Sequence, residues 1–303
     1  MKRVLVCGSN GLLGQKLAFI LDDESEYEVL HTSYHRSFVN NQDLFDYTQL
    51  DISNRSDVKS LILSYRPDIV LNAAALTNVD FCEREREQAW KVNVTGVEHL
   101  VEVCRRINAK LIHVSTDYVF DGKFGNYTEE DRVNPVNYYG KTKLAGENVI
   151  ISSGIDYAIL RTILVYGIGV QVKNNFALWV INNLNEGKLI RCVDDQISNP
   201  THVHDLAMAM KKVMERNANG LFHISGAETI SRYNFALRAA EIFGYDKSLI
   251  AQIKTADLEQ RAVRPMNTTF ILEKAKVQLK YTPMNITQGL MMMQQDITGI
   301  HLN

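Results

Sequence analysis

The chain has 303 residues, 46% of them hydrophobic, which is enough to bury a substantial core without disulfides or structural metals. Its 33 basic and 35 acidic residues leave a formal net charge of −2, so no global basic field favours nucleic-acid binding. The cysteines at positions 7, 82, 104 and 192 have neither CxxC nor zinc-finger spacing, and we expect Cys7 and Cys104 to be small core residues.

The amino-terminal segment begins with two positive charges, Lys2 and Arg3, followed by four apolar residues that end at Gly8. An apolar run this short cannot be the core of a signal peptide. No stretch of the sequence approaches the ~20 apolar residues of a membrane-spanning helix. We therefore expect a soluble protein of the reducing cytoplasm, with no membrane partner.

The first part of the chain alternates between short apolar strands and helices. Residues 2–7 are expected to form a strand, and apolar positions 12, 13, 17, 20 and 21 recur at helical spacing. Further strands are expected at 27–33, 68–71, 110–115 and 157–161, and helical segments at 58–65, 88–106 and 139–149. This alternation predicts an α/β fold, a doubly wound parallel Rossmann sheet whose strands end on one edge.

Beyond Thr162 the alternation becomes irregular. Helices are expected at 174–185, 202–214 and 233–243, and strands at 189–193 and 221–224. Because helix 202–214 and strand 221–224 fit the sheet, we expect residues 1–161 plus 202–224 to form a dinucleotide-binding domain. Residues 162–201 plus 225–303 are then a smaller, discontinuous α+β lobe that binds substrate.

A glycine turn with the sequence GSNGLLG occupies residues 8–14, between the first strand and the first helix. This context lets backbone amides and the helix dipole approach a pyrophosphate. We expect the turn to bind a dinucleotide; the alternative is a tight turn that serves only helix packing. The expected cofactor contacts here are Gly8, Asn10, Gly11, Leu12, Leu13 and Gly14.

The end of the second strand indicates which dinucleotide is bound. An NAD site usually places an acidic residue about 20 residues after the glycines, where it holds the ribose hydroxyl. This chain has Arg36 in that region, and a guanidinium can instead bind a 2′-phosphate. We therefore expect NADPH, with NADH as the second choice; the alternative for Arg36 is a solvated loop charge.

Two later segments are also expected to line the cofactor. Asp51 and Ile52 follow the third strand, where an acid can accept from the adenine amine, although Asp51 can equally cap a helix. Small residues at the end of the fourth strand, Ala73, Ala74 and Ala75, would let the backbone approach the cofactor; tight packing is the alternative reading of this run.

Two polar residues, Asn93 and His113, are expected to have structural rather than catalytic roles. Asn93 falls inside a predicted helix, where asparagine is a poor helix former, so we expect it to bond a neighbouring backbone or water unless it is solvated. His113 lies in a strand, and we interpret it as a satisfied buried histidine rather than a ligand or base.

Tyr139 and Lys143 are four residues apart on a predicted helix, so both side chains lie on one face. Lowering the pKa of a phenol from ~10 towards neutral costs about 3 to 4 kcal/mol. One ammonium at ~4 Å supplies about 4 kcal/mol at an effective dielectric of 20. Tyr139 is therefore a candidate proton donor to a carbonyl that receives hydride, and Thr116, at the end of the preceding strand, would add a hydroxyl at the carbonyl oxygen.

These segments resemble the extended short-chain dehydrogenase/reductase family, and within it the dTDP-4-dehydrorhamnose reductase branch. The matching stretches span nearly the whole chain: residues 8–14, 72–80 (NAAALTNVD), 115–122 (STDYVFDG), 137–147 (NYYGKTKLAGE) and Arg264-Pro265. The resemblance implies Thr116, Tyr139 and Lys143 as a catalytic triad, with Lys143 also holding the nicotinamide ribose. It also implies substrate contacts from Thr77, Val79, Asp80, Asp117, Tyr118 and Arg264.

Single residues refine what the resemblance implies. A sugar-nucleotide dehydratase would carry an acid pair after the catalytic threonine, whereas here Asp117 is followed by Tyr118. Some reductases of this branch bind magnesium at a dimer contact through acids just after the glycine turn, but this chain has Gln15 there, so we expect no metal. The helices 88–106 and 139–149 can pair across a two-fold, as in many relatives, and a homodimer is the expected assembly unless their faces are solvated.

Three functions remain open at this stage. The first is NADPH-dependent reduction of a nucleoside-diphosphate keto sugar, with dTDP-4-dehydrorhamnose giving dTDP-rhamnose. The second is a non-catalytic dinucleotide-binding module, because residues 124–131, 139–147 and 220–226 also resemble the regulatory β subunit of methionine adenosyltransferase. The third is a nucleotide-sugar epimerase with tightly held NAD.

Overall fold

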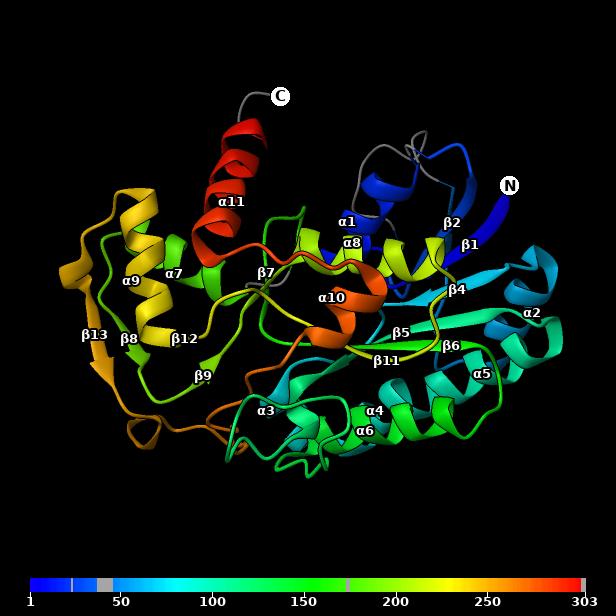
Figure 1. The fold of residues 1–303 in the computed structure, drawn as a ribbon, viewed down its shortest axis with the longest axis horizontal. Coiled ribbons are helices and arrows are strands. Elements are labelled where there is room, and N and C mark those ends of the chain that lie inside the picture. The colour runs from blue at the N-terminus through cyan, green and yellow to red at the C-terminus, as the bar shows by residue number, and fades with distance from the viewer. Residues whose placement is uncertain (23, 37–45, 173–174, 301–303) are drawn as a thin grey trace.

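The computed structural model describes residues 1–22, 24–36, 46–172 and 175–300. Seven parallel strands form the central sheet, in the order β11-β6-β5-β4-β1-β2-β3 (Figure 1). The strands are β1 (Lys2–Cys7), β2 (Tyr27–Ser33), β3 (Tyr47–Gln49), β4 (Ile69–Asn72), β5 (Lys110–Thr116), β6 (Tyr157–Thr162) and β11 (Gly220–Ile224). The strand order reverses beside β1, which creates the crevice where doubly wound folds bind ligands.

Helices cover both faces of this sheet, and the residues of β1 alternate between them. Val4 and Val6 pack with one set of helices, whereas Leu5 and Cys7 pack with the other. The first set is α1 (Leu12–Asp22), α8 (Val203–Glu215) and α10 (Glu273–Leu279). The second set is α2 (Arg55–Tyr65), α5 (Gly96–Ile107) and α6 (Tyr138–Ile151).

A second hydrophobic core lies to one side of the sheet, on the left of Figure 1. It is built from α7 (Phe176–Asn185), α9 (Arg232–Phe243), α11 (Ile286–Ile300) and the parallel pair β8 (Ile190–Val193) and β13 (Ile250–Ile253). Short strand pairs join it to the sheet: β7 (Val165–Tyr166) with β10 (Thr201–His202), and β9 (Ile197–Ser198) with β12 (Ile230–Ser231). The remaining helical turns are α3 (Val79–Arg84), α4 (Arg86–Trp90), η1 (Lys91–Thr95), η2 (Asp117–Val119), η3 (Lys247–Leu249) and η4 (Thr255–Asp257).

The sequence prediction of a doubly wound parallel α/β fold is confirmed. The continuous helix expected at 88–106 is wrong in detail, because a π-helical turn, η1, separates α4 from α5. The first residue of the helix expected at 174–185 lies outside the described residues; α7 begins at Phe176. Strand β11 joins the sheet beside β6, while the division into a dinucleotide-binding and a substrate-binding unit stays a prediction.

Two further sequence expectations concern the cysteines and membranes. Cys7 and Cys104 are fully buried, as expected for small core residues, and all four cysteines are free thiols. Within the described ranges, no helix is long and apolar enough to cross a bilayer.

A buried ion pair ties α6 to the sheet. Arg161 on β6 donates from Nε and Nη2 to the two carboxylate oxygens of Glu147, at 2.9 and 2.7 Å. Their side chains are only 5% and 0% exposed. Because water cannot replace either partner, removal of one leaves a buried charge without compensation.

We expect Glu147→Gln to lower the free energy of unfolding by about 3 to 5 kcal/mol, because Arg161 then lacks its countercharge. Urea unfolding followed by circular dichroism measures this change. Glu102→Gln is the matched control: Glu102 pairs with Arg55 on the surface, where solvent screens the charges, so its loss should leave the free energy of unfolding nearly unchanged. Equal losses in the two variants would contradict a structural role for the buried pair.

Candidate active site

The glycine turn joins β1 to α1 and is shaped by contacts that exclude side chains. Gly8 has a φ of 90°, and a Cβ there would lie 2.8 Å from the amide nitrogen of Ala74. A Cβ at Gly14 would lie 2.3 Å from the carbonyl oxygen of Gly8. The turn therefore lies directly against the end of β4, and it leaves a backbone cradle at the start of α1 that suits a pyrophosphate.

Asn10 connects this turn to the end of β2. Its Nδ2 donates to the carbonyl oxygens of His35 at 3.2 Å and Arg36 at 2.9 Å. Arg36 thus lies beside the turn with an exposed side chain, in the region where a 2′-phosphate would bind. The neighbouring Ser37 lies outside the described residues.

Gln15 follows the glycine turn directly, is buried, and makes structural hydrogen bonds. Its Nε2 donates to the carbonyl oxygens of Asn10 and Val170 at 2.9 and 2.8 Å, and its Oε1 accepts from the Val170 amide at 2.8 Å. The amide therefore links the glycine turn to the segment that follows β7. In the part of the chain that the structure describes, no three His, Cys, Asp or Glu side chains gather as a metal site would require.

The other predicted cofactor residues lie at the same edge of the sheet. Asp51 accepts from the amide and hydroxyl of Ser53, at 2.9 and 2.7 Å, so it stabilises the turn before α2, whose N-cap is Asn54. Ile52 is buried against Gly96 of α5. The backbone amide of Ala73 donates to the backbone carbonyl oxygen of Cys7 at 3.0 Å. This bond brings residues 73–75 next to the glycine turn.

Asn93 holds the loop that follows β4. Its Oδ1 accepts from the Leu76 amide at 2.8 Å, and its Nδ2 donates to the Leu76 carbonyl and to Thr142 Oγ1, both at 3.0 Å. The expectation that Asn93 bonds a neighbouring backbone is confirmed. The π turn η1 places this side chain between the loop and α6, and such turns are frequent at functional sites. Thr77 follows directly in this loop.

Thr116 is the last residue of β5, and Asp117 opens η2 directly after it. Thr116 Oγ1 donates to Asp117 Oδ1 at 3.0 Å and accepts from the Tyr118 amide at 3.2 Å. Thr268 donates to the other carboxylate oxygen of Asp117, at 2.5 Å. Burial raises the pKa of Asp117 to about 6, even though the bonds from Thr268 and Thr116 favour its ionised form.

The first turn of α6 places Tyr139 beside these residues. Asn137 caps the helix by accepting from the Gly140 amide at 2.8 Å, and Glu83 accepts from the Tyr138 amide at 2.6 Å. Gly140 permits close contact, since a Cβ there would lie 2.1 Å from the carbonyl oxygen of Tyr118. The Tyr139 ring consequently meets the Tyr118 ring edge-on, with centroids 5.9 Å apart.

Lys143 lies one turn further along α6 and is directed towards β5. Its Nζ lies 3.1 Å from His113 Nε2 and donates to the Val114 carbonyl oxygen at 2.8 Å. Burial lowers the pKa of Lys143 to about 8. Burial also raises the pKa of Tyr139 above its ordinary value, so the downward shift expected from a neighbouring ammonium is not found in this arrangement.

A bidentate ion pair links the loop after β4 to the second lobe. Arg264 donates from Nη1 and Nη2 to the two oxygens of Asp80, at 3.2 and 2.6 Å. The Ala262 amide also donates to Asp80, at 2.9 Å. Although burial opposes it, these bonds hold the pKa of Asp80 below its ordinary value. Val79 opens α3 beside this pair, so the predicted substrate residues of both segments are brought together.

Arg232 is a site residue that the sequence interpretation missed. It is the first residue of α9, and its guanidinium lies 5.0 Å from the centroid of the Phe176 ring. Burial lowers the pKa of Arg232, while the charges of Tyr118 and Asp117 oppose this shift. Arg232 therefore brings a second guanidinium, besides Arg264, to the side of the site formed by the second lobe. No motif surrounds it in the sequence, so only the fold could reveal it.

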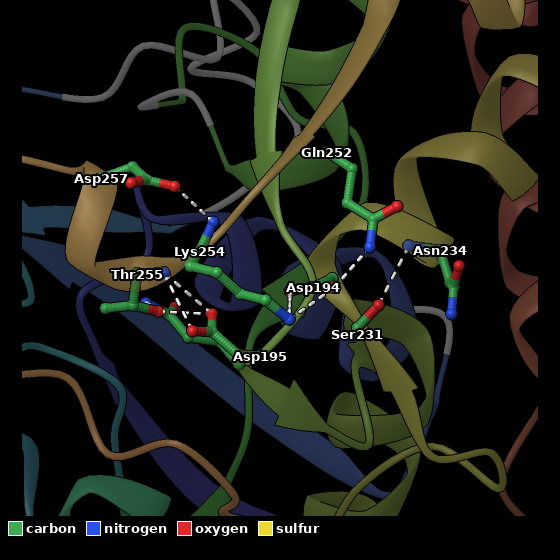
Figure 2. Close-up of polar contacts among 9 residues, drawn as sticks. Asp194, Asp195, Ser231, Asn234, Gln252, Lys254, Thr255 and Asp257 are labelled. Carbon is green, nitrogen blue, oxygen red and sulfur yellow. Dashed lines mark hydrogen bonds and ion pairs between the residues drawn. The ribbon is translucent and has the colours of Figure 1, made fainter.

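Figure 2 shows the polar network that supports the start of α9. Ser231 caps the helix by accepting from the Asn234 amide at 3.1 Å. Asp195 accepts from the amide and hydroxyl of Thr255, and Asp194 accepts from Lys254 Nζ, so the ends of β8 and β13 are joined. Gln196 completes the link, because its side chain donates to Thr255 and its carbonyl accepts from the Arg232 amide.

The fold and the site together define an extended short-chain dehydrogenase/reductase: a doubly wound sheet with a glycine turn after β1 and a Thr, Tyr and Lys set on β5 and α6. The model of the RmlD substrate binding domain family matches residues 1–298. The chain belongs to this family, as the sequence resemblance indicated.

Relatives and solved structures agree with this assignment. The dTDP-4-dehydrorhamnose reductase of Aggregatibacter actinomycetemcomitans is 36% identical over 90% of this chain and 92% of its own. The structure of a dTDP-4-dehydrorhamnose reductase from Clostridium acetobutylicum is similar with a TM-score of 0.88, at 31% identity over 98% of this chain and 99% of that one. That of the Bacillus anthracis reductase, in complex with NADP, has a TM-score of 0.84, at 29% identity over 97% and 99%.

The chain is also similar to a protein of another kind. Methionine adenosyltransferase 2 subunit beta of Xenopus laevis is 30% identical over 83% of this chain and 75% of its own. The second resemblance noted in the sequence is thus confirmed as a similarity.

We expect Asn93→Ala to lower the free energy of unfolding by about 1 to 3 kcal/mol, since the amide and carbonyl of Leu76 lose their buried partner. Denaturant titration measures the loss. Asn148→Ala, at an exposed position of α6, serves as control and should stay within about 0.5 kcal/mol of the wild type. If both variants unfold at the wild-type midpoint, Asn93 does not hold the loop.

Proposed function

We propose that this protein is an NADPH-dependent reductase of a nucleoside-diphosphate keto sugar, converting dTDP-4-dehydrorhamnose to dTDP-rhamnose. The observation that carries the proposal is the placement of Thr116, Tyr139 and Lys143 around the end of β5, in a chain of the RmlD family. The similarity to named reductases over nearly the full length of the chain supports the same substrate.

The residues present fit a nicotinamide dinucleotide. The backbone of the glycine turn forms a cradle for phosphate. Gly8 and Gly14 are required there because a Cβ at either position would collide with neighbouring backbone atoms. In this proposal the pyrophosphate is held by residues 8–14, the adenosine by Arg36, Asp51 and Ile52, and the nicotinamide side by Ala73, Ala74, Ala75, Tyr139 and Lys143. The bound NADPH supplies the hydride. Arg36 supports NADPH over NADH because its backbone carbonyl bonds Asn10 of the turn and its side chain is exposed.

The catalytic roles follow from the position and charge of each group. Tyr139, whose pKa is raised by burial, carries its proton at neutral pH and gives it to the sugar oxygen as hydride arrives at carbon. Thr116 places its hydroxyl beside the same oxygen. Lys143, one helical turn from Tyr139, stabilises the phenolate that proton transfer leaves, because an ammonium favours the ionised neighbour.

The substrate is held from both lobes. Thr77, Val79 and Asp80 approach it from the loop after β4, and Asp117 and Tyr118 from the end of β5. Arg264 and Arg232 supply two guanidinium groups, the side chain best suited to bidentate contact with phosphate. The Asp80 pair fixes the orientation of Arg264.

A regulatory dinucleotide-binding role and a nucleotide-sugar epimerase are the alternative functions. The similarity to methionine adenosyltransferase subunit beta supports a dinucleotide-binding regulatory role as the second candidate. The complete Thr, Tyr and Lys set favours the enzyme. An epimerase would retain NAD through gel filtration and need no added NADPH. A homodimer in the cytoplasm stays the expected state of the protein.

The main test is NADPH oxidation with dTDP-4-dehydrorhamnose as substrate, in wild type and Tyr139→Phe. Loss of a positioned general acid should lower kcat by about 10²- to 10⁴-fold, while NADPH binding measured by fluorescence stays within a few-fold. Tyr138→Phe, the adjacent tyrosine on α6, is the matched control and should keep wild-type turnover.

The outcomes separate the candidates. Turnover that survives in Tyr139→Phe would contradict the role given to this residue. Absence of turnover in the wild type, together with NADPH binding and a copurifying stoichiometric protein, would favour the regulatory module instead.

We also expect Arg36→Ala to weaken NADPH binding by about tenfold or more, since a charge-assisted bond to phosphate is worth about 1.5 to 3 kcal/mol. NADH binding should stay unchanged. Arg132→Ala, an exposed arginine distant in sequence, controls for the loss of one positive charge. Equal weakening of both dinucleotides would show that Arg36 does not select the 2′-phosphate.

A further inference from the structure

A buried chain of polar contacts runs across two neighbouring strands and ends at Lys143. Asn72, the last residue of β4, lies with its Nδ2 at 3.0 Å from His113 Nδ1 on β5. The other ring nitrogen, His113 Nε2, lies 3.1 Å from Lys143 Nζ. Asn72, His113 and Lys143 are only 0%, 1% and 2% exposed, so each of these polar groups depends on the next for a partner.

The orientation of the Asn72 amide fixes the position of the proton on the ring. Asn72 Oδ1 accepts from the backbone amide of Ala74 at 3.1 Å, and this bond leaves Nδ2 facing His113. An amide nitrogen can only donate, so His113 Nδ1 must accept. A neutral imidazole carries one proton, which is therefore on Nε2, and burial holds the pKa of His113 well below its ordinary value.

The Nε2 proton of His113 points at Lys143. An ammonium has three donors and no acceptor, so a charged Lys143 would set donor against donor at 3.1 Å. A neutral amine has a lone pair that accepts from Nε2–H while one of its own protons goes to the Val114 carbonyl oxygen at 2.8 Å. Only the neutral amine satisfies every contact in this chain.

The other charge near Lys143 does not reverse this preference. On α6 itself, Glu147 lies one turn away and favours the ammonium. Its two carboxylate oxygens, however, are taken up by the bidentate bond to Arg161 of β6, so its charge is largely compensated. On β5, the titratable group that faces Lys143 is His113.

We propose that His113, held by Asn72 as the Nε2–H tautomer, is a positioning residue that favours the neutral amine of Lys143 in the free protein, so that in mildly alkaline solution dinucleotide binding takes up a proton at Lys143 Nζ. The inference rests on the proposed dinucleotide site. The proton comes from solvent and adds to the lone pair of Nζ. The ammonium then gives up its contact with His113 Nε2–H and directs its protons to the Val114 carbonyl oxygen and to the hydroxyls of a ribose, which supply the acceptors that it needs. Lys143 then acquires the charge that its role beside Tyr139 requires.

The tautomer can be measured on the protein alone, by long-range ¹H–¹⁵N NMR of the histidine rings. We expect His113 to carry its proton on Nε2 in the wild type. Asn72→Asp is nearly isosteric and replaces the donor with an acceptor, so the proton of His113 should move to Nδ1. A wild-type ring protonated on Nδ1, or an unchanged tautomer in the variant, would overturn the proposal.

Proton uptake is measured by calorimetry of NADPH binding at pH 8.5 in two buffers with different ionisation enthalpies. The 2′-phosphate is fully ionised at this pH and contributes no proton. With the pKa of Lys143 at about 8 before binding, the wild type should take up about three quarters of a proton. In Asn72→Asp the ring offers Nε2 as an acceptor, Lys143 is already charged, and uptake should fall close to zero.

The control is His223→Phe. His223 is a buried histidine of β11 that stacks on Phe270, and its loss should leave the uptake at the wild-type value. Binding without proton uptake in the wild type would overturn the inference while leaving the proposed function intact. If NADPH does not bind at all, the proposed function fails, and the NMR measurement still decides the tautomer. Both wild-type measurements stand even if Asn72→Asp does not fold.

Discussion

The burial of two ionisable side chains one turn apart on α6 sets the geometry of the whole site. Lys143 and Glu147 face the sheet, where an unpartnered charge would be very costly. Glu147 finds Arg161 on β6, and Lys143 finds His113 and the Val114 carbonyl on β5. Because the two strands are neighbours, these pairs together fix both the rotation of α6 and its position along the sheet. Tyr139, one turn before Lys143, is thereby placed at the end of β5.

Close backbone contacts make this docking possible. Gly140 lets the first turn of α6 touch the carbonyl of Tyr118, and Gly146 brings the helix against the carbonyl of Asn93, where a Cβ would lie 2.7 Å away. The same approach allows Asn93 to reach both the loop after β4 and Thr142 on α6. Gly140, Gly146 and the π turn η1 therefore act together. They set the distance between the loop after β4 and α6, the helix that carries Tyr139 and Lys143.

The sequence revealed most of what depends on local pattern. Apolar periodicity predicted strand β2, and sequence motifs predicted the glycine turn and the pairing of Tyr139 with Lys143 on one helix. The rules of parallel topology predicted that these elements meet at one edge of the sheet. The interruption of the long helix at η1 could not be predicted, because the period of the apolar residues changes little across one π turn. Asn93 nevertheless indicated a tertiary contact correctly, because asparagine is a poor helix former and its place in a helix suggested that its side chain bonds a neighbouring segment.

What the sequence could not provide are contacts between distant segments. Arg232 lies in no motif and enters the site only because α9 begins beside β8, and Glu83 reads as part of an exposed charge run although it caps α6. His113 was interpreted as a satisfied buried histidine, which is correct as far as packing goes. Its donor and acceptor pattern depends on the amide of Asn72, forty-one residues earlier, and on the backbone of Ala74.

The electrostatic state of the site follows from the same burial that positions it. Burial raises the pKa of Tyr139 and of Asp117 and lowers that of Lys143, so each group is driven towards its neutral form. A site in which acid and amine are both neutral avoids the desolvation cost of two charges in the folded protein. The charge separation that proton transfer requires is then stabilised only when acceptors for the Lys143 ammonium are present. Such an arrangement ties the reactivity of Tyr139 to the presence of the dinucleotide, because binding favours the Lys143 ammonium that stabilises its phenolate.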